Sequence, residues 1–333
     1  MMLDLVITRG PDNDESLASF VRRRFGTEAL ERVVQPMIGG IYTADPEKLS
    51  IKATTPQFLE MERKHGSVIL GMLKSSRENK SDSGARYSQF LSFKNGMQTL
   101  VEALKQSLPP GSVFLNETVT EISQTGEFWN IQTENRAIDA AGVIVTTLSY
   151  HAANLVKDIN SDLSSDLSSI EYASSAVVII AYKNEQISQE LNGFGFVVPD
   201  IEESDLIACS FSSVKFDGRA PKGFTLLRAF VGGALNPGIC DLDDKQIMEK
   251  SIRELSSILG IEGDPAFTMI QRYPEAMPQY HVGHLETVKR IMSKSAQYRG
   301  VKFAGNAYYG VGIPECVHSG ETASESIVKD LFD

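Results

Sequence analysis

Apolar residues recur at helical spacing over the first ninety residues of the chain. Leu17, Phe20 and Val21 follow Asp14 at positions i, i+3 and i+4, and similar sets repeat further along. A period near 3.6 residues indicates amphipathic helices, and an acidic residue just ahead of such a set favours a helix start. We therefore predict a helical subdomain over residues 12–90.

A longer apolar stretch, residues 58–73, follows the helix start expected at Thr55-Pro56. It is rich in Leu, Met, Val and Ile, which is typical of a helix face in the core. Two other interpretations stay open: the stretch covers an apolar ligand, or it touches a membrane surface. The polar run that follows, residues 75–84, predicts a surface loop.

The apolar stretches become shorter after residue 96. Apolar positions from 97 to 108 predict one amphipathic helix, which Pro109-Pro110 ends. Short runs of strand-forming residues come next. They lie at residues 112–115, 118–122, 128–132 and 142–148.

A second set of strands is expected between residues 151 and 285, with one helix among them. This helix spans about 243–259, because acidic residues just before it suit an N-cap and Gly260 ends it. Residues 161–169 predict a surface connection. Strands interrupted in this way favour a mixed sheet covered by helices, so the fold class is α/β with α+β character. The strand runs are 176–182, 194–198, 206–211, 224–231 and 266–272.

A strand, a glycine-spaced turn and a helix follow one another near the C-terminus. Residues 301–304 predict the strand, and Pro314 opens the helix because a proline needs no N–H partner there. Gly310 and Gly312 allow a ligand to approach the backbone closely. The first N–H groups of the helix, at Gly312 and Ile313, favour a phosphate or a ligand group that becomes negative, such as a reduced flavin.

Composition narrows the classes of function. The 333 residues include 32 basic and 43 acidic ones, a formal charge of -11, which argues against binding nucleic acid or anionic lipid. The one basic cluster, Arg22-Arg23-Arg24, is interpreted as a solvated helix face. The 42% hydrophobic content is that of a globular protein.

Other catalytic and metal-binding patterns find little support. Cys209, Cys240 and Cys316 have no metal-ligand spacing, and a reducing cytoplasm is the expected location. No G-x-S-x-G, P-loop or HExxH motif occurs, and His281 and His284 alone make a poor metal site. No apolar run has the length of a membrane span. No metal and no catalytic acid or base is therefore predicted.

Four segments, in order, resemble the porphyrinogen oxidases, the FAD-dependent oxidases of haem biosynthesis that are related to monoamine oxidases. The most specific is AGNAYYGVGIPECVHSGE at residues 304–321, which resembles their C-terminal flavin segment. The others are residues 14–26 with 34–50, SFKNGMQTLV at 92–101, and PEAMPQYHVGH at 274–284. Gln35-Pro36, residues 39–42 and Asp45-Pro46 resemble porphyrinogen oxidases more than amine oxidases.

The resemblance implies an FAD-binding domain, a substrate domain and a helical subdomain. It assigns residues 91–150 and 286–333 to a Rossmann-like FAD-binding domain and residues 151–285 to a substrate-binding domain with a mixed sheet. The Rossmann-like domain is expected to be incomplete, because the GxGxxG turn that holds the FAD pyrophosphate in such proteins does not occur in these residues. Three explanations stay open: a truncated gene or misplaced start, a second chain that supplies this unit, or a remnant that no longer binds FAD.

The resemblance also implies cofactor-binding residues. Val119 falls where a backbone meets the adenine ring, although an ordinary strand residue is an equal interpretation. Tyr273 stands where the family usually has tryptophan, and it retains an aromatic wall. The remaining implied residues are Gly305, Asn306, Gly310, Val311, Gly312 and Ile313.

The function implied is FAD-dependent oxidation of coproporphyrinogen III or protoporphyrinogen IX to the porphyrin, with oxygen as acceptor. A non-catalytic remnant that binds tetrapyrrole or a partner chain is the alternative, and a related FAD-dependent amine oxidase is the runner-up within the enzymes. Expected partners are the porphyrinogen and either a second copy or a second chain, with peripheral membrane contact left open.

Overall fold

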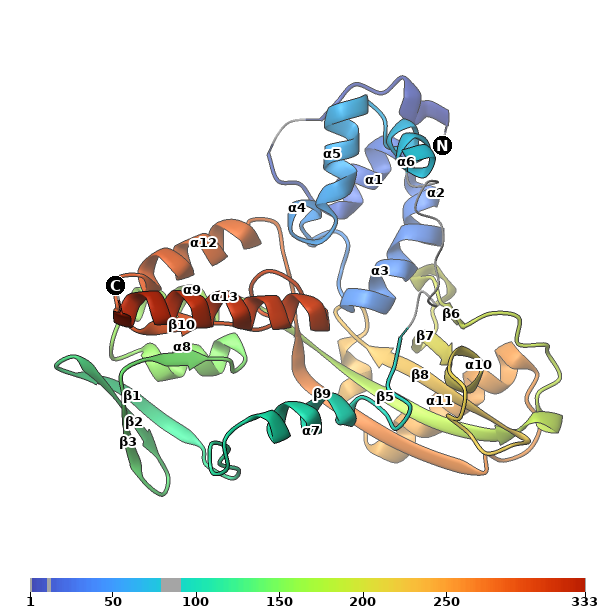
Figure 1. Cartoon of the computed structure of the whole chain (residues 1–333). Coiled ribbons are helices and arrows are strands. Elements are labelled where there is room, and N and C mark those ends of the chain that lie inside the picture. Colours follow the sequence, from blue (N-terminus) through green and yellow to red (C-terminus); the bar gives the residue numbers. More distant parts are fainter. Residues whose placement is uncertain (1, 11–12, 79–90, 333) are drawn as a thin grey trace. The chain divides into compact units, whose positions relative to one another are not determined.

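The computed structural model describes residues 2–10, 13–78 and 91–332 (Figure 1). The chain divides into two compact units. The first unit comprises Met1–Lys94 and Tyr172–Val282, and the second comprises Asn95–Glu171 and Gly283–Asp333. The predicted helical subdomain and most of the second strand set fall in the first unit, whereas residues 151–171 fall in the second. The cofactor and substrate roles assigned to these segments stay predictions.

Helices form the N-terminal part of the first unit, as the apolar spacing predicted. Ser16 caps α1 by accepting a hydrogen bond from the Ser19 N–H, and Gly26, with φ of 90°, ends it. Pro56 opens α5 as expected. The helices are η1 (Met2–Leu5), α1 (Leu17–Phe25), α2 (Thr27–Ala29), the π-helix η2 (Leu30–Val34), α3 (Gln35–Tyr42), α4 (Ile51–Thr54), α5 (Pro56–His65) and α6 (Val68–Glu78).

The basic cluster on α1 is not a solvated helix face. Only Arg22 is exposed; the Arg24 side chain is wholly buried between Asp4 and Glu62. Its Nε donates to Glu62 Oε1 at 2.7 Å and its Nη1 donates to Asp4 Oδ1 at 3.1 Å. The solvated-face interpretation is therefore wrong, because buried carboxylates neutralise a cation that would otherwise require water.

A five-stranded sheet forms the rest of the first unit, in the order β6-β7-β8-β5-β9. Every pairing in it is antiparallel, so the expected mixed sheet is corrected in this respect. β8 and β9 do run parallel, joined through α11, but β5 lies between them. The strands are β5 (Tyr172–Lys183), β6 (Gly195–Val197), β7 (Leu206–Phe211), β8 (Phe224–Gly232) and β9 (Phe267–Pro278).

Helix α11 (Asp244–Leu259) packs on this sheet, where the predicted helix was placed (Figure 1). Asp243 caps its start and Gly260, with φ of 59°, ends it. Ile247 and Leu255 share one buried cluster with Val178 of β5. Shorter elements complete the unit: η4 (Asn184–Gln186), η5 (Asp200–Glu202), α10 (Ser212–Lys215) and η6 (Pro237–Asp241).

The second unit contains two small sheets. One is antiparallel, in the order β1-β2-β3, and the other is a parallel pair of β4 and β10. Trp129, the single tryptophan of the chain, is buried on β2, and its Nε1 donates to the Arg299 carbonyl at 2.9 Å. The strands are β1 (Val119–Thr125), β2 (Phe128–Thr133), β3 (Ala137–Ala140), β4 (Val143–Val145) and β10 (Val301–Phe303).

Helices complete the second unit, and α12 and α13 contact β10 of the parallel pair. Residues 161–169, predicted as a surface connection, instead form α9 and its C-cap, because Asn160 caps the start of the helix and Leu163 and Leu167 bury one face. The strand expected at 112–115 is absent, and these residues are exposed coil. The helices are α7 (Gln98–Ser107), α8 (Ser149–Val156), α9 (Ser161–Ser168), α12 (His284–Ser295) and α13 (Ile313–Phe332).

Candidate functional site

The predicted strand, turn and helix near the C-terminus are present as β10, residues 304–312 and α13. Helix α13 begins at Ile313, one residue before the expected start at Pro314. The Cys316 N–H donates to the Gly312 carbonyl at 3.0 Å, which closes the first helical turn. The N–H groups that begin α13 therefore lie directly after the glycine-spaced turn, as expected from the sequence.

Two contacts hold the turn against the flanking helices. Gly305 has φ of 125°, which favours glycine, and its N–H donates to Ser319 Oγ of α13 at 3.1 Å. On the other side, Nε2 of the buried His284, the first residue of α12, lies 3.0 Å from the Tyr308 carbonyl. The turn is thus tied to both α12 and α13.

Glu315 lies across the glycine turn. A Cβ atom added at Gly310 or Gly312 would collide with the Glu315 side chain, so these two glycines leave space for it. Neither glycine has a positive φ. A carboxylate in the first turn of α13 is favourable because the helix dipole is positive there. In this structure the carboxylate therefore lies beside the turn at which the sequence predicts a negative ligand group.

The eight predicted cofactor residues fall in three places. Val119 begins β1 in the second unit and is 37% exposed. Tyr273 lies on β9 in the first unit, opposite Ser175 of β5, and its side chain is 43% exposed. The turn and the start of α13 bring the other six together: Gly305, Asn306, Gly310, Val311, Gly312 and Ile313.

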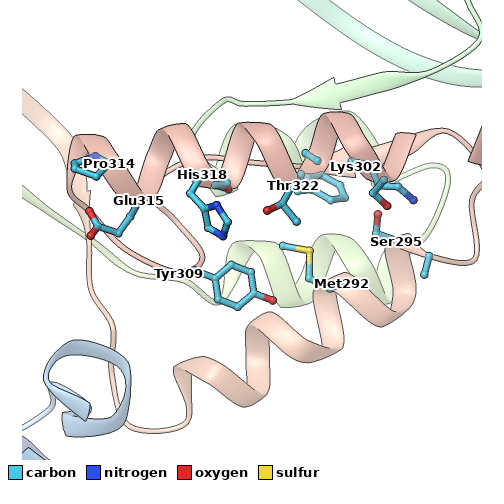
Figure 2. Close-up of a pocket in the computed structure, with 13 residues that line it drawn as sticks. Met292, Ser295, Lys302, Tyr309, Pro314, Glu315, His318 and Thr322 are labelled. Carbon is cyan, nitrogen blue, oxygen red and sulfur yellow. The ribbon is translucent and has the colours of Figure 1, made fainter. Parts of the chain in front are cut away.

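The sequence did not predict a groove that lies between α12 and α13 (Figure 2). It is a cavity of about 820 Å³ with β10 along it. Met292 of α12 and His318 and Thr322 of α13 face it, as does Tyr309 of the turn. The apolar face of α12 was a signal for it, but only the fold shows that α13 lies opposite. The other lining residues are Ser295, Ala296, Lys302, Phe303, Pro314, Glu315, Ser319, Ala323 and Ser326.

Charges near the groove are few and mostly paired. Lys302 of β10 donates to Asp330 at the end of α13 at 2.6 Å, and this hydrogen bond lowers the pKa of Asp330. Burial raises the pKa of the Cys316 thiol, and the neighbouring Glu315 raises it further, so the thiol is protonated at neutral pH. These groups give the site no nucleophile.

The residues of the turn fit one end of a flavin. The start of α13 offers N–H groups and a positive dipole to the ring edge that becomes negative on reduction. The fit requires the Glu315 carboxylate to move aside, since two negative charges would otherwise lie together. The pyrophosphate end of FAD has no GxGxxG turn among these 333 residues.

Within residues 2–10, 13–78 and 91–332, no helix has the length and apolar character needed to cross a bilayer. Over the same ranges, no three His, Cys, Asp or Glu side chains gather as metal ligands would.

Comparison with known proteins places the chain in a family. The model of the flavin containing amine oxidoreductases matches residues 3–328. The coproporphyrinogen III oxidase of Bacillus subtilis (strain 168) is 35% identical over 324 residues, covering 96% of this chain and 68% of the relative. The coproporphyrinogen III oxidase of Staphylococcus aureus (strain NCTC 8325 / PS 47) is 32% identical over 333 residues, covering 97% and 71%.

A solved structure agrees with these relatives. The crystal structure of a putative protoporphyrinogen oxidase from Exiguobacterium sp. 255-15 superposes on this chain with a TM-score of 0.83 at 30% identity, covering 99% of this chain and 71% of that one. The fold class and the family predicted from the sequence are thereby confirmed. The chain belongs to the flavin containing amine oxidoreductases, in the group of the porphyrinogen oxidases, and FAD is the cofactor that this membership implies.

Proposed function

We propose that this chain forms the main part of a porphyrinogen oxidase of haem biosynthesis. The reaction is the FAD-dependent oxidation of coproporphyrinogen III or protoporphyrinogen IX to the porphyrin, and oxygen is the electron acceptor. The observation that carries the proposal is the 35% identity to a coproporphyrinogen III oxidase over 96% of the chain. The glycine turn before α13 lies inside the matched region.

The turn and α13 hold the ring end of the flavin in this proposal. The N–H groups of Gly312 and Ile313 face the ring edge, and Asn306 and Val311 line it. FAD bound there would supply the redox chemistry, and the residues of the chain would supply orientation and electrostatics. The α13 dipole serves this purpose better than a titrating side chain, because it stays positive at every pH. Tyr273 provides an aromatic wall, and the Val119 backbone meets the adenine.

A non-catalytic role is the second candidate. It is favoured by the position of Glu315, whose side chain lies against Gly310 and Gly312. In this candidate the chain binds a tetrapyrrole or another protein and takes up no flavin.

An absorption spectrum separates the two candidates. The purified chain is measured alone and after incubation with FAD and removal of the free cofactor. Bound oxidised flavin, followed by conversion of either porphyrinogen to the fluorescent porphyrin with consumption of oxygen, supports the oxidase. A colourless protein that neither retains FAD nor oxidises the two porphyrinogens would reject it for the 333-residue chain.

A cytoplasmic location with peripheral membrane contact belongs to the same proposal. Helix α6 exposes Leu70, Met72 and Leu73, which are 40%, 53% and 57% exposed, whereas Val68 on the same helix is buried. The core interpretation of residues 58–73 therefore holds for only part of the stretch. Because the chain carries a net charge of -11, we expect flotation with vesicles of neutral lipid and not of anionic lipid. A Leu70→Ser, Leu73→Ser double variant should lose this flotation.

A further inference from the structure

Strand β9 bulges where it pairs with β5 in the first unit. The pairing register shifts at Ser174, and this single residue of β5 lies opposite residues 274–276 of β9. Tyr273 is the last residue of β9 to pair before the bulge, and Pro274, which has no N–H for a ladder, begins it. Bulges re-aim neighbouring side chains. The conformation of this bulge therefore affects the direction in which the Tyr273 ring points.

The hydroxyl of Ser174 contacts the centre of the bulge. Ser174 Oγ accepts a hydrogen bond from the Glu275 N–H at 2.9 Å. Glu275 has φ of 42°, in the left-handed region that residues other than glycine rarely adopt. A backbone conformation of this kind persists only where surrounding contacts fix it. The Ser174 hydroxyl supplies such a contact.

The backbone of Ser174 is itself fixed from the other side of β5, because β5 lies between β8 and β9 (Figure 1). The Ser174 carbonyl accepts from the Gly233 N–H, just after β8, at 2.8 Å. Gly232 has φ of 97°, and a Cβ atom there would lie 2.8 Å from the same carbonyl oxygen, so β8 approaches β5 closely. The Ala234 N–H then donates to the carbonyl of Thr43, the C-cap of α3, at 2.8 Å. Ser174 therefore connects a fixed part of the unit to the bulge.

The Tyr273 side chain lies on the face of the sheet opposite α11. Arg272, the preceding residue, reaches α11, where its Nε donates to Asp244 Oδ1 at 2.6 Å. Ala176, which pairs with Arg272, belongs to the buried cluster shared with α11. Successive side chains of a strand point to opposite faces, so Tyr273 points away from α11, and its side chain is exposed. With little packing around the ring, its direction depends on the backbone at the bulge.

We propose that Ser174 is a positioning residue for Tyr273. Its hydroxyl holds the bulge in one conformation, and the bulge holds the aromatic ring in one direction. The consequence for the cofactor rests on the proposed function, in which Tyr273 provides an aromatic wall of the flavin site. A ring that is already ordered loses less conformational freedom when a ligand packs on it, so Ser174 favours flavin binding. The positioning of Tyr273 itself concerns the flavin-free chain.

Fluorine NMR of the flavin-free chain, labelled with 3-fluorotyrosine, tests the positioning. The Tyr273→Phe variant identifies the Tyr273 resonance, and hydrogen exchange at the Glu275 N–H follows the bulge. Ser174→Ala removes the hydroxyl. Ser174→Thr and Ser174→Val have the same shape as each other, and only threonine retains the acceptor, so this pair decides the question even if the alanine variant folds poorly. Ser175→Ala is the matched control, because this neighbouring serine pairs with Tyr273 through its backbone.

Loss of the hydroxyl in Ser174→Ala and Ser174→Val should speed exchange at the Glu275 N–H by roughly two- to tenfold, as expected for one lost hydrogen bond. The same two variants should move the Tyr273 resonance. Ser174→Thr and Ser175→Ala should leave both signals close to those of the wild type. A Tyr273 resonance that stays in place in Ser174→Val, or that moves equally in Ser174→Thr, would overturn the proposal.

A flavin titration of the same variants tests the consequence for the cofactor. Ser174→Val should bind FAD roughly two- to tenfold more weakly than Ser174→Thr and should shift the flavin absorption bands. Equal affinities and spectra in these two variants, together with a moved Tyr273 resonance, would overturn the part of the inference that concerns flavin. A wild-type chain that takes up no FAD would contradict the proposed function, whereas the fluorine result would still decide whether Ser174 positions Tyr273.

Discussion

Arg24 of α1 donates a hydrogen bond of 2.7 Å from Nε to Oε1 of Glu62 of α5, and both side chains are buried. Arg24 also donates to the Ile7 and Gly66 carbonyls at 3.2 and 3.0 Å, and Arg23 donates to the same carboxylate at 2.5 Å. The pair therefore joins the N-terminal segment, α1 and α5. The helical part of the first unit is organised around it.

Removing the Glu62 charge should destabilise the first unit strongly. Glu62→Gln leaves a buried guanidinium with less compensation, and breaking a buried pair in this way costs about 3–5 kcal/mol. Glu47→Gln is the matched control, because Glu47 pairs with Arg22 at the surface, where a salt bridge contributes about 0–1 kcal/mol. Urea denaturation measures the free energy of unfolding of both variants. Equal losses from the two variants would contradict the central role of the buried pair.

The same carboxylate predicts how stability depends on pH. Burial raises the pKa of Glu62, but hydrogen bonds from Arg23 and Arg24 outweigh it, so the pKa lies below its ordinary value. A group with a lowered folded pKa stabilises the protein above the unfolded pKa, near 4.3, and this contribution is lost as the pH falls through the folded pKa. The stability difference between wild type and Glu62→Gln should therefore shrink below about pH 4.3. A difference that is constant from pH 7 to 3 would refute this assignment.

An ion pair between α9 and α12 should stabilise the second unit. Lys294 donates to Asp166 at 2.7 Å and Arg290 donates to it at 3.1 Å. Burial raises the pKa of Asp166, but the hydrogen bonds from these two donors outweigh burial, so the pKa lies below its ordinary value. We expect Asp166→Asn to cost roughly 1.5–3 kcal/mol, the range for hydrogen bonds to charged groups.

The fluorescence of Trp129 measures the stability of the Asp166→Asn variant. Trp129 is the single tryptophan, it is buried, and it lies in the second unit, so its fluorescence follows the unfolding of that unit. Asp158→Asn, which removes the same charge from an exposed position, should leave the fluorescence transition within about 0.5 kcal/mol of wild type. If both variants shift the transition alike, the effect is one of net charge.

Local signals explain what the sequence could predict. Helix α11 was placed closely because its ends depend on neighbouring residues, Asp243 with Gln246 at one end and Gly260 at the other. Contacts distant in sequence were not predictable. Arg24 donates hydrogen bonds to Asp4 and Glu62, which are 20 and 38 residues away. The residues of α1 alone carry no trace of these partners, so they indicated a solvated helix face.

In the candidate site, too, the sequence predicted the parts that depend on neighbouring residues and not those that depend on distant contacts. The turn before α13 is one continuous segment, so its glycines and Ile313 were placed from the sequence. The position of Glu315 over the turn depends on a side-chain conformation, and the groove depends on α12 and α13 flanking one strand. Neither leaves a periodic signal in the chain.

Glu315 provides a test of the proposed flavin contact. Its carboxylate lies against Gly312 at the start of α13, where the proposal places the ring edge that becomes negative on reduction. Glu315→Gln removes a competing negative charge and retains the side-chain shape. FAD should therefore bind more tightly by roughly two- to tenfold, equal to about 0.4–1.4 kcal/mol. The reduced flavin should gain more than the oxidised one, so the reduction potential should rise.

A flavin titration and a potentiometric titration measure the two effects. Glu325→Gln is the control, because it removes the same charge from an exposed position further along α13, outside the groove. It should change affinity and potential little, since an exposed charge is screened over such a distance. Equal affinity and equal potential in Glu315→Gln and Glu325→Gln would show that the flavin ring does not lie at the start of α13. A rise in potential confined to Glu315→Gln would place the negative edge of the reduced ring beside Gly312.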